Sequence, residues 1–137
     1  MHGPYTKLRL TVGLVTLLYL CGCQSMNREE LAWQALHVMD VAQTLNAASD
    51  PCYVESAWLT QRLIGEQPRH EEVLAWGVAT AVIHMLVSRA LEARGAPEWL
   101  QRTWSVTTIS HTAYALASNH NEGIRMWGDN DPRDCRR

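Results

Sequence analysis

Four titratable side chains lie on four separate segments of the sequence: Asp40, Glu55, His84 and His111. Two imidazoles and two carboxylates that meet inside a helical bundle could bind zinc or a similar ion, or could divide the roles of general acid and general base. The spacing gives this idea little support, because no two of them lie three or four residues apart on one helix and no HExxH motif occurs. The alternative is a solvated Asp40 with core histidines satisfied by Ser and Thr neighbours. We therefore predict no catalytic residue, metal or cofactor, and keep these four as the candidates.

Other motifs are less complete. His37 and Asp40 lie three residues apart and could meet on one helix face, where we expect an exposed ion pair. The acidic stretch from Asp129 to Asp134 lacks the further ligands and the glycine of an EF-hand, so we expect a charged tail. No Gly-x-Ser-x-Gly nucleophile motif occurs.

The first predicted helix begins after Asn27 and runs to about Ala48. Asn27 is a suitable N-cap, and the pair Glu29-Glu30 opposes the positive end of the helix dipole. A helical wheel separates an apolar arc, which we expect to face the core, from a more polar one. The apolar arc contains Leu31, Ala35, Val38, Met39, Val41, Ala42 and Leu45, and the opposite arc contains Trp33, His37, Asp40 and Thr44.

Two further long helices and one short element follow. Residues 55–65 form a short helix or an ordered loop between breaks at Pro51 and Pro68. The segment 73–91 is the most apolar of the mature chain, with its polar residues on one narrow seam, so it is either central to a bundle or in a membrane. The last helix runs from Glu98 to about Ser118, and a solvated tail follows. The predicted fold is all-α: a small up-and-down bundle of three main helices plus a short helix, after an N-terminal signal helix.

Two residue lists define the arcs of these helices. The seam in the segment 73–91 consists of Gly77, Thr80, His84 and Ser88. In the last helix, one arc holds Trp99, Val106, Ile109, Ala113, Leu116 and Ala117, and the other holds Trp104, Thr107, Thr108, His111 and Thr112.

The N-terminal segment has the pattern of an export signal. Lys7 and Arg9 precede an apolar run that is too short to span a bilayer and ends in small residues. The closing residues, Leu20-Cys21-Gly22-Cys23, resemble the lipobox of bacterial lipoproteins. That resemblance implies that the Cys23 thiol is acylated and becomes the first residue of the mature protein. The predicted organisation is a signal peptide at 1–22 and a single helical domain with a polar C-terminal tail at 23–137.

The predicted location is the periplasmic face of a bacterial membrane. Gln24 after the lipidated cysteine resembles the signal for transfer to the outer membrane, which we therefore favour over the inner membrane. Nucleic acid is not an expected partner: after cleavage, ten basic residues remain against fourteen acidic ones, a formal charge of −4. The expected partners are the membrane, through the lipid anchor, and possible envelope proteins.

A second resemblance concerns the mature part of the chain. The run Asp40-Val-Ala-Gln43-Thr44, followed by Glu55, Leu59, Gly65 and Pro68, resembles a group of small uncharacterised bacterial helical proteins. Their pattern is an Asp-x-x-Gln-Thr helix followed by a Glu-x-Asn-Pro-Leu loop, whereas Ala57-Trp58 stands here in place of Asn-Pro. The resemblance implies that Asp40, Thr44 and Glu55 face one another.

The six tryptophans, Trp33, Trp58, Trp76, Trp99, Trp104 and Trp127, fall near predicted helix starts or in loops. This placement suits an interfacial belt near lipid headgroups. It suits equally a small bundle whose corners are filled by indole rings, which is the interpretation that we favour.

The function predicted from the sequence is a lipid-anchored envelope protein with a non-catalytic binding or structural role. One alternative is a metal-dependent or acid/base enzyme that uses Asp40, Glu55, His84 and His111. Another is a small polytopic membrane protein in which 73–91 spans the bilayer, although Arg89 lies inside that segment.

Cys52 and Cys135 are the cysteines that lie outside the signal, and in an oxidising compartment we predict that they form a disulfide. Iodoacetamide should then modify neither thiol before reduction and both after it, as read by mass spectrometry. Because the bridge closes a long loop, reduction should lower the free energy of unfolding by about 4 kcal/mol. Alkylation of either cysteine without a reductant would contradict the pairing.

Overall fold

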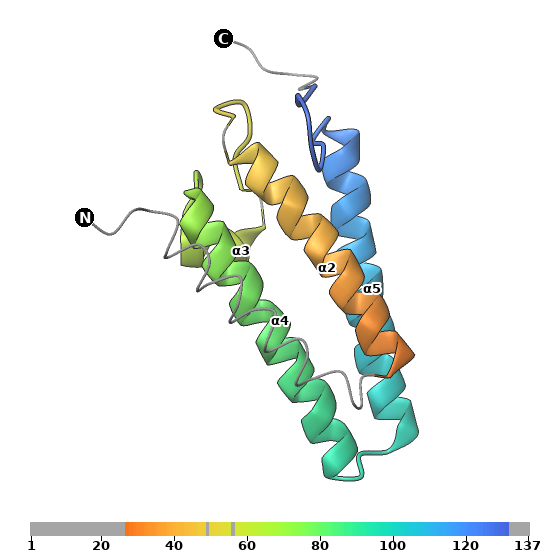
Figure 1. The fold of residues 1–137 in the computed structure, drawn as a ribbon. Coiled ribbons are helices and arrows are strands. Elements are labelled where there is room, and N and C mark those ends of the chain that lie inside the picture. The colour runs from red at the N-terminus through yellow and green to blue at the C-terminus, as the bar shows by residue number, and fades with distance from the viewer. Residues whose placement is uncertain (1–26, 49, 56, 132–137) are drawn as a thin grey trace, which may run out of the picture.

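The computed structural model describes residues 27–48, 50–55 and 57–131, and these fold into four helices (Figure 1). The helices are α2 (Arg28–Ala47), α3 (Trp58–Ile64), α4 (His70–Ala93) and α5 (Glu98–Asn121). No strand occurs in these ranges, so the predicted all-α bundle of three long helices and a short one is confirmed. The predicted signal peptide and Cys23 lie outside the described residues, as does Cys135.

Helix α2 is the central element, because it packs along both other long helices, whereas α4 and α5 touch each other less extensively. The three helices alternate in direction, as the colours of Figure 1 show, with α4 and α5 joined by a tight turn at one end. The short helix α3 packs against α4. The interior of the bundle is therefore formed where α4 and α5 each meet α2.

Local sequence signals set the helix ends. The Asn27 side chain accepts a hydrogen bond from the backbone N–H of Glu30 at 2.7 Å, which confirms the predicted N-cap. Glycines with positive φ lie two residues after the last residue of α4 and of α5: Gly95 (φ 63°) and Gly123 (φ 84°). After each glycine the next backbone N–H returns to the helix, Ala96 to Leu91 and Ile124 to Asn119, both at 2.9 Å, which is the Schellman arrangement.

Helix α5 is three residues longer than predicted. It continues to Asn121 because its last turn has partners: the Asn119 side chain donates to Asp40 Oδ1 at 3.1 Å, and the Asn119 carbonyl accepts from Ile124. The predicted break at Asn119 is therefore wrong.

The amphipathic orientation predicted for α2 is also wrong. The arc expected in the core is largely on the surface, with Leu31 61% and Val38 55% exposed, whereas Trp33 and His37 from the opposite arc are buried. The physical reason is that Glu30, Gln34 and His37, at helical spacing, face the polar seam of α4. That seam offers hydrogen-bond partners that a solvated surface would otherwise supply.

In α5 neither arc is buried as a whole. Trp99 (68%) and Val106 (56%) are exposed from one arc, and Thr107 and His111 are exposed from the other, of which only Thr112 is buried. The seam of small and polar residues on α4 points inward. It faces α2, which comes close to α4 at Gly77. The interior of this bundle is accordingly rich in polar groups: its buried polar or charged residues are Glu30, Gln34, His37, Gln43, His84 and Thr112, against the buried apolar Trp33, Val73 and Ile124.

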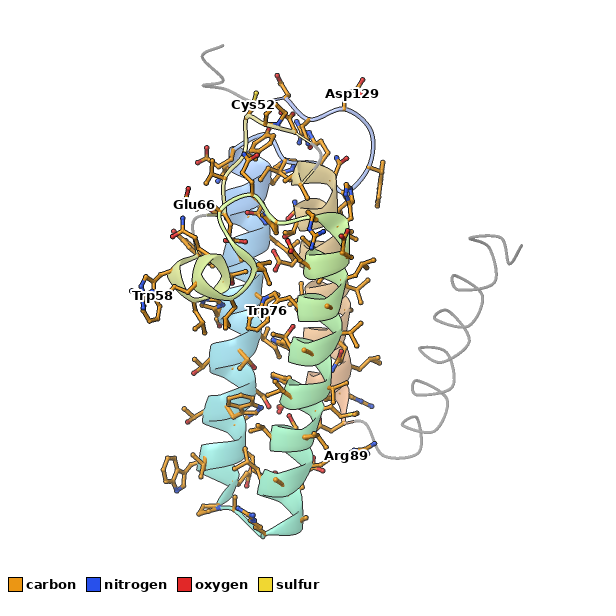
Figure 2. The ribbon with its side chains drawn as sticks, turned by 90° about the vertical axis from the view of Figure 1, so that its left-hand side faces the viewer. Cys52, Trp58, Glu66, Trp76, Arg89 and Asp129 are labelled. Atoms are coloured by element: carbon orange, nitrogen blue, oxygen red, sulfur yellow. The ribbon has the colours of Figure 1, made fainter. Side chains whose placement is uncertain are left out.

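The segment after α5 is not a free solvated tail as far as it is described. Ile124 is buried, and the backbone N–H of Asp131 donates to the Gly123 carbonyl at 3.0 Å. The Asn46 side chain at the end of α2 donates to the carbonyls of Arg125 (3.0 Å) and Gly128 (3.1 Å). Residues 123–131 therefore close one end of the bundle, and Figure 2 shows Asp129 at the same end as Cys52.

The tryptophans divide into two groups. Trp33 is buried and the Trp104 indole N–H donates to Ser88 Oγ at 3.1 Å, as expected for rings that fill a bundle. Trp58, Trp99 and Trp127 are 65%, 68% and 77% exposed, and Figure 2 shows Trp58 directed away from the bundle. The interpretation of indole rings that fill the bundle therefore fits Trp33 and Trp104, and the interfacial belt stays a prediction.

Gly77 marks the closest approach of α4 to α2. A Cβ built there would lie 2.8 Å from Cγ2 of Val41, a stiff β-branched side chain. We expect Gly77→Ala to destabilise the bundle by about 1–2 kcal/mol in urea unfolding, because the overlap outweighs the gain in helix propensity. Val41→Ala makes room, so the double variant should be more stable than the two single effects predict. An unchanged urea midpoint for Gly77→Ala would contradict the close approach.

Candidate functional site

The strongest polar arrangement in the structure is a buried carboxylate–imidazole pair between α2 and α4. Glu30 Oε2 lies 2.9 Å from His84 Nδ1, and each residue is only 5% exposed. The Ser88 hydroxyl donates to the same oxygen at 2.7 Å, and the Gln34 amide donates to Glu30 Oε1 at 2.8 Å. The carboxylate therefore receives three hydrogen bonds, which is how a buried charge is tolerated.

Two indoles enclose the imidazole of His84. The Trp33 ring stacks on it with centroids 3.6 Å apart and planes 4° from parallel, and the Trp104 ring stacks at 4.9 Å and 27°. The remaining ring nitrogen, Nε2, lies 3.0 Å from the Thr108 hydroxyl of α5. All three long helices thus contribute to one cage around His84, which we call the His84 cage: Glu30, Trp33, Ser88, Trp104 and Thr108.

The His84 cage accommodates two proton arrangements. An ionised Glu30 only accepts, so His84 Nδ1 carries a proton. The Thr108 hydroxyl has one proton, which points either to His84 Nε2 or to the Trp104 carbonyl at 2.9 Å. In the first case the imidazole is neutral, and in the second Nε2 donates to Thr108 and the imidazole is charged. The order Glu, His, Thr matches the connectivity of a nucleophilic triad, but the Thr108 hydroxyl is engaged within its own helix.

The surroundings lower the pKa of Glu30. Burial is the largest influence and by itself raises the pKa of this carboxyl. The hydrogen bonds donated by His84, Ser88 and Gln34, together with the charge on His84, outweigh burial, so the pKa of Glu30 lies below its ordinary value of 4.5. The ionised form of Glu30 is thus the one that the fold stabilises.

The polar contact between α2 and α4 continues beyond the cage. The Gln34 amide also donates to the Ala81 carbonyl at 3.1 Å. His37 Nε2 lies 2.9 Å from the Gly77 carbonyl, to which it donates, and 3.0 Å from the Thr80 hydroxyl. The predicted exposed ion pair between His37 and Asp40 is therefore wrong, because His37 is buried against α4 and stacks on Trp33 with centroids 4.7 Å apart.

The structure does not gather the four sequence candidates at one point. His84 belongs to the cage described above and pairs with Glu30. Asp40 is half-buried on α2 and accepts from Asn119, whereas His111 is exposed on α5. Glu55 lies in the loop before α3, where its carboxylate accepts from the backbone N–H of Ala57 at 2.7 Å.

Glu55 and His111 nevertheless influence the pKa of the Asp40 carboxyl through space. Burial raises the pKa of Asp40, and the charge of Glu55 raises it further, while His37, His111 and the Asn119 hydrogen bond lower it less. The pKa of Asp40 is therefore above its ordinary value. Across the described ranges, no group of three or more His, Cys, Asp or Glu side chains is placed to hold a metal ion.

The second resemblance predicts that Asp40, Thr44 and Glu55 face one another. The Thr44 hydroxyl donates to the backbone carbonyl of Asp40 at 3.0 Å, within the same helix. Glu55 is close enough to influence the Asp40 carboxyl, as its effect on that pKa shows.

Glu30 was not predicted as a site residue, because a glutamate in the first turn of a helix is already explained by its favourable interaction with the helix dipole. The signal was present: Glu30, Gln34 and His37 recur at spacings of four and three, as do Gly77, Thr80, His84 and Ser88 on α4. Two polar stripes of equal period on two helices are complementary, and pairing them would have predicted this interface.

Comparison of the chain with protein-family models, with curated proteins and with solved structures finds no match. Conclusions about function therefore depend on the sequence and on the geometry described above.

The substitution Glu30→Gln removes the carboxylate from the buried Glu30–His84 pair and measures how much that carboxylate contributes to stability. We expect a loss of about 1–3 kcal/mol in urea unfolding at neutral pH, because His84 loses its ionic partner. Since the pKa of Glu30 is lowered on folding, the unfolded chain binds more protons in acid, and wild-type stability falls as pH decreases from about 5 to about 3. Glu30→Gln should lose less stability over that range.

The neighbouring Glu29 provides the matched control, because it is exposed and lies in the same first turn of α2. Glu29→Gln should change stability at neutral pH by less than about 0.5 kcal/mol and keep the acid dependence of the wild type. Equal behaviour of the two variants would show that the Glu30–His84 pair contributes nothing specific.

Proposed function

We propose that this protein is a lipid-anchored component of the bacterial cell envelope that acts by binding and not by catalysis. The lipid is carried by Cys23, at the periplasmic face of a membrane, with the outer membrane favoured. The observation that supports the binding role is that the exposed faces of two adjacent helices carry no polar side chains along most of their length.

These two apolar faces are the outer face of α2 and the outer face of α4. Every exposed residue of α2 between positions 31 and 39, and every exposed residue of α4 between positions 74 and 86, is apolar. The two faces consist of Leu31, Ala32, Ala35, Val38 and Met39 of α2 and of Leu74, Ala75, Val78, Ala79, Ile83 and Leu86 of α4. Their large side chains are between 39% (Met39) and 61% (Leu31) exposed, and exposed apolar side chains in such number are typical of interaction sites.

The bundle interior supports a non-catalytic role. The polar groups of the His84 cage bond to one another, which leaves them occupied in holding the helices together. In the part of the chain that the structure describes, Gln43 Oε1 is the one fully buried side-chain oxygen or nitrogen without a hydrogen-bond partner. A carboxylate and an imidazole that serve each other in this way act as structural groups.

The geometry of one end of the bundle favours the predicted disulfide. The Cys52 loop and Asp129 lie at the same end (Figure 2), and three residues separate Asp131 from Cys135. A bridge between Cys52 and Cys135 would suit a protein that functions in an oxidising compartment.

A second candidate function is a small polytopic membrane protein. One observation favours it: α4 is the helix among the described residues that is long and apolar enough to cross a membrane by length and composition, with a mean hydropathy of 1.5. Core helices of soluble proteins pass the same test, but only 17% of that apolar window is buried here.

Mass spectrometry of the protein isolated from bacterial membranes tests the anchor. We expect a mature chain that begins at Cys23 and carries the added mass of fatty acyl chains. Cys23→Ser should abolish both the added mass and the cleavage. Cys21→Ser changes the other cysteine of the same motif and should be processed as the wild type is. An intact precursor with an unmodified Cys23 thiol would overturn the proposal.

A further inference from the structure

We infer that the His84 cage is a pH-sensitive clasp: it holds His84 as a doubly protonated imidazolium ion, and loss of one of these protons above neutral pH loosens the attachment of α5. This inference goes beyond the proposed function and does not depend on the lipid anchor. The hydrogen bonds, the ring stacking and the charges of the cage each favour the charged imidazole.

The proton on Nδ1 of His84 is fixed by the carboxylate of Glu30. Glu30 Oε2 lies 2.9 Å from His84 Nδ1, and an ionised carboxylate only accepts hydrogen bonds. The same oxygen accepts from the Ser88 hydroxyl at 2.7 Å, and the Ser88 oxygen accepts from the Trp104 indole N–H at 3.1 Å. Every donor in this chain of hydrogen bonds is directed toward Glu30, which leaves Nδ1 protonated.

The proton on Nε2 follows from the direction of the Thr108 hydroxyl. Its oxygen lies 3.0 Å from His84 Nε2 and 2.9 Å from the Trp104 carbonyl, one turn earlier on α5. Four other threonines in the helices donate to the carbonyl four residues earlier, at 2.8–3.0 Å: Thr44, Thr80, Thr103 and Thr112. When the one proton of Thr108 is used in the same way, its oxygen accepts from His84, and Nε2 carries a proton.

His37 provides a second example of this arrangement in the same interior. Its Nε2 donates to a backbone carbonyl of α4 at 2.9 Å and lies 3.0 Å from the Thr80 hydroxyl. That hydroxyl donates to the Trp76 carbonyl at 2.8 Å. Thr80 thus keeps its proton on its own helix although an imidazole nitrogen lies within reach, and Thr108 stands in the same relation to His84.

The two indole rings of the cage also favour a charged imidazole. The ring centroids of Trp33 and Trp104 lie 3.6 Å and 4.9 Å from that of His84. A cation within about 6 Å of an indole face is attracted to it. Burial opposes the charge, because His84 is only 5% exposed, but the adjacent Glu30 carboxylate makes the pair neutral as a whole.

The charge of the cage depends on Glu30 and His84 alone. From α2, the other titratable side chain near the cage is His37, which stacks on Trp33 with centroids 4.7 Å apart. Helix α4 contributes Ser88, and α5 contributes an indole and a hydroxyl, which do not titrate near neutral pH.

Loss of the Nε2 proton would weaken both links between His84 and α5. A neutral ring loses the cation attraction to Trp104, and its bare nitrogen competes for the proton that Thr108 gives to its own helix. An imidazole in the unfolded chain releases its proton near pH 6.5, whereas the cage retains it. The free energy of unfolding should therefore fall as pH rises above about 6.5.

Nitrogen NMR of the full-length protein, labelled with ¹⁵N-histidine and held in detergent micelles, reads the proton state directly. At pH 7.5 a free imidazole is about nine-tenths neutral. We expect both nitrogens of His84, identified by contacts with the ring protons of Trp33 and Trp104, to be protonated at this pH. Glu30→Gln should leave one of them bare, whereas Glu29→Gln should not. A bare nitrogen in the wild type would overturn the inference, and so would two protonated nitrogens in Glu30→Gln.

Urea unfolding at pH 6.5 and at pH 8.5 tests the consequence for stability. We expect the urea midpoint of the wild type to fall between these two pH values. His84→Gln has no proton to lose there, so its midpoint should change by less than half as much. Glu30→Gln, in which His84 has already lost the proton, should behave alike and replaces His84→Gln if that variant does not fold. An equal fall in the wild type and the variant would overturn the clasp, because other groups would then account for it.

These outcomes are independent of the test of the anchor. A bare His84 nitrogen at pH 7.5 together with an acylated Cys23 would remove the clasp and leave the proposed function standing. A doubly protonated His84 together with an unmodified Cys23 would do the reverse.

Discussion

The buried pair of Glu30 and His84 is the constraint on which the rest of this structure depends. Removing an ionised carboxylate from water costs several kcal/mol unless its hydrogen bonds are replaced, so the fold must supply donors from every side. Gln34 supplies one from the same helix, and Ser88 and His84 supply the others from α4. The helices are therefore held in one register, because sliding α4 by one turn would separate the carboxylate from its partners.

This constraint explains the distribution of apolar residues. The faces of α2 and α4 that meet are occupied by polar groups, so most of the aliphatic residues of these helices point outward. The aromatic rings of Trp33 and Trp104 supply much of the apolar contact around His84. A bundle built in this way has many of its side-chain hydrogen bonds inside and a large part of its apolar surface outside.

Local features could be predicted from the sequence, and the orientation of the helices could not. The N-cap at Asn27 and the glycines that end α4 and α5 act within one turn of the chain, so their residue types are sufficient to place them. Which arc of α2 faces inward depends on the partner helix. The usual assumption that apolar arcs face the core failed, because it treats each helix alone, while Glu30 and His84 are 54 positions apart.

The candidate site, like the fold, could be predicted only in part. His84 stood out as a polar residue in an apolar helix, and its Thr contact was of the expected kind. Its carboxylate partner was hidden, because a glutamate in the first turn of a helix already has a sufficient explanation in the dipole. Glu55 and His111 each influence the pKa of Asp40, in opposite directions, but the three groups do not converge on a common point.

The His84 cage also dictates when the chain can fold. Glu30 stands in the first turn of α2, whereas Trp104 and Thr108 are on α5, so the interior cannot close until almost the whole polypeptide has been synthesised. Contacts of such high sequence separation delay folding. A nascent chain of this kind therefore keeps its interior open until α5 is available, and its three long helices become compact together.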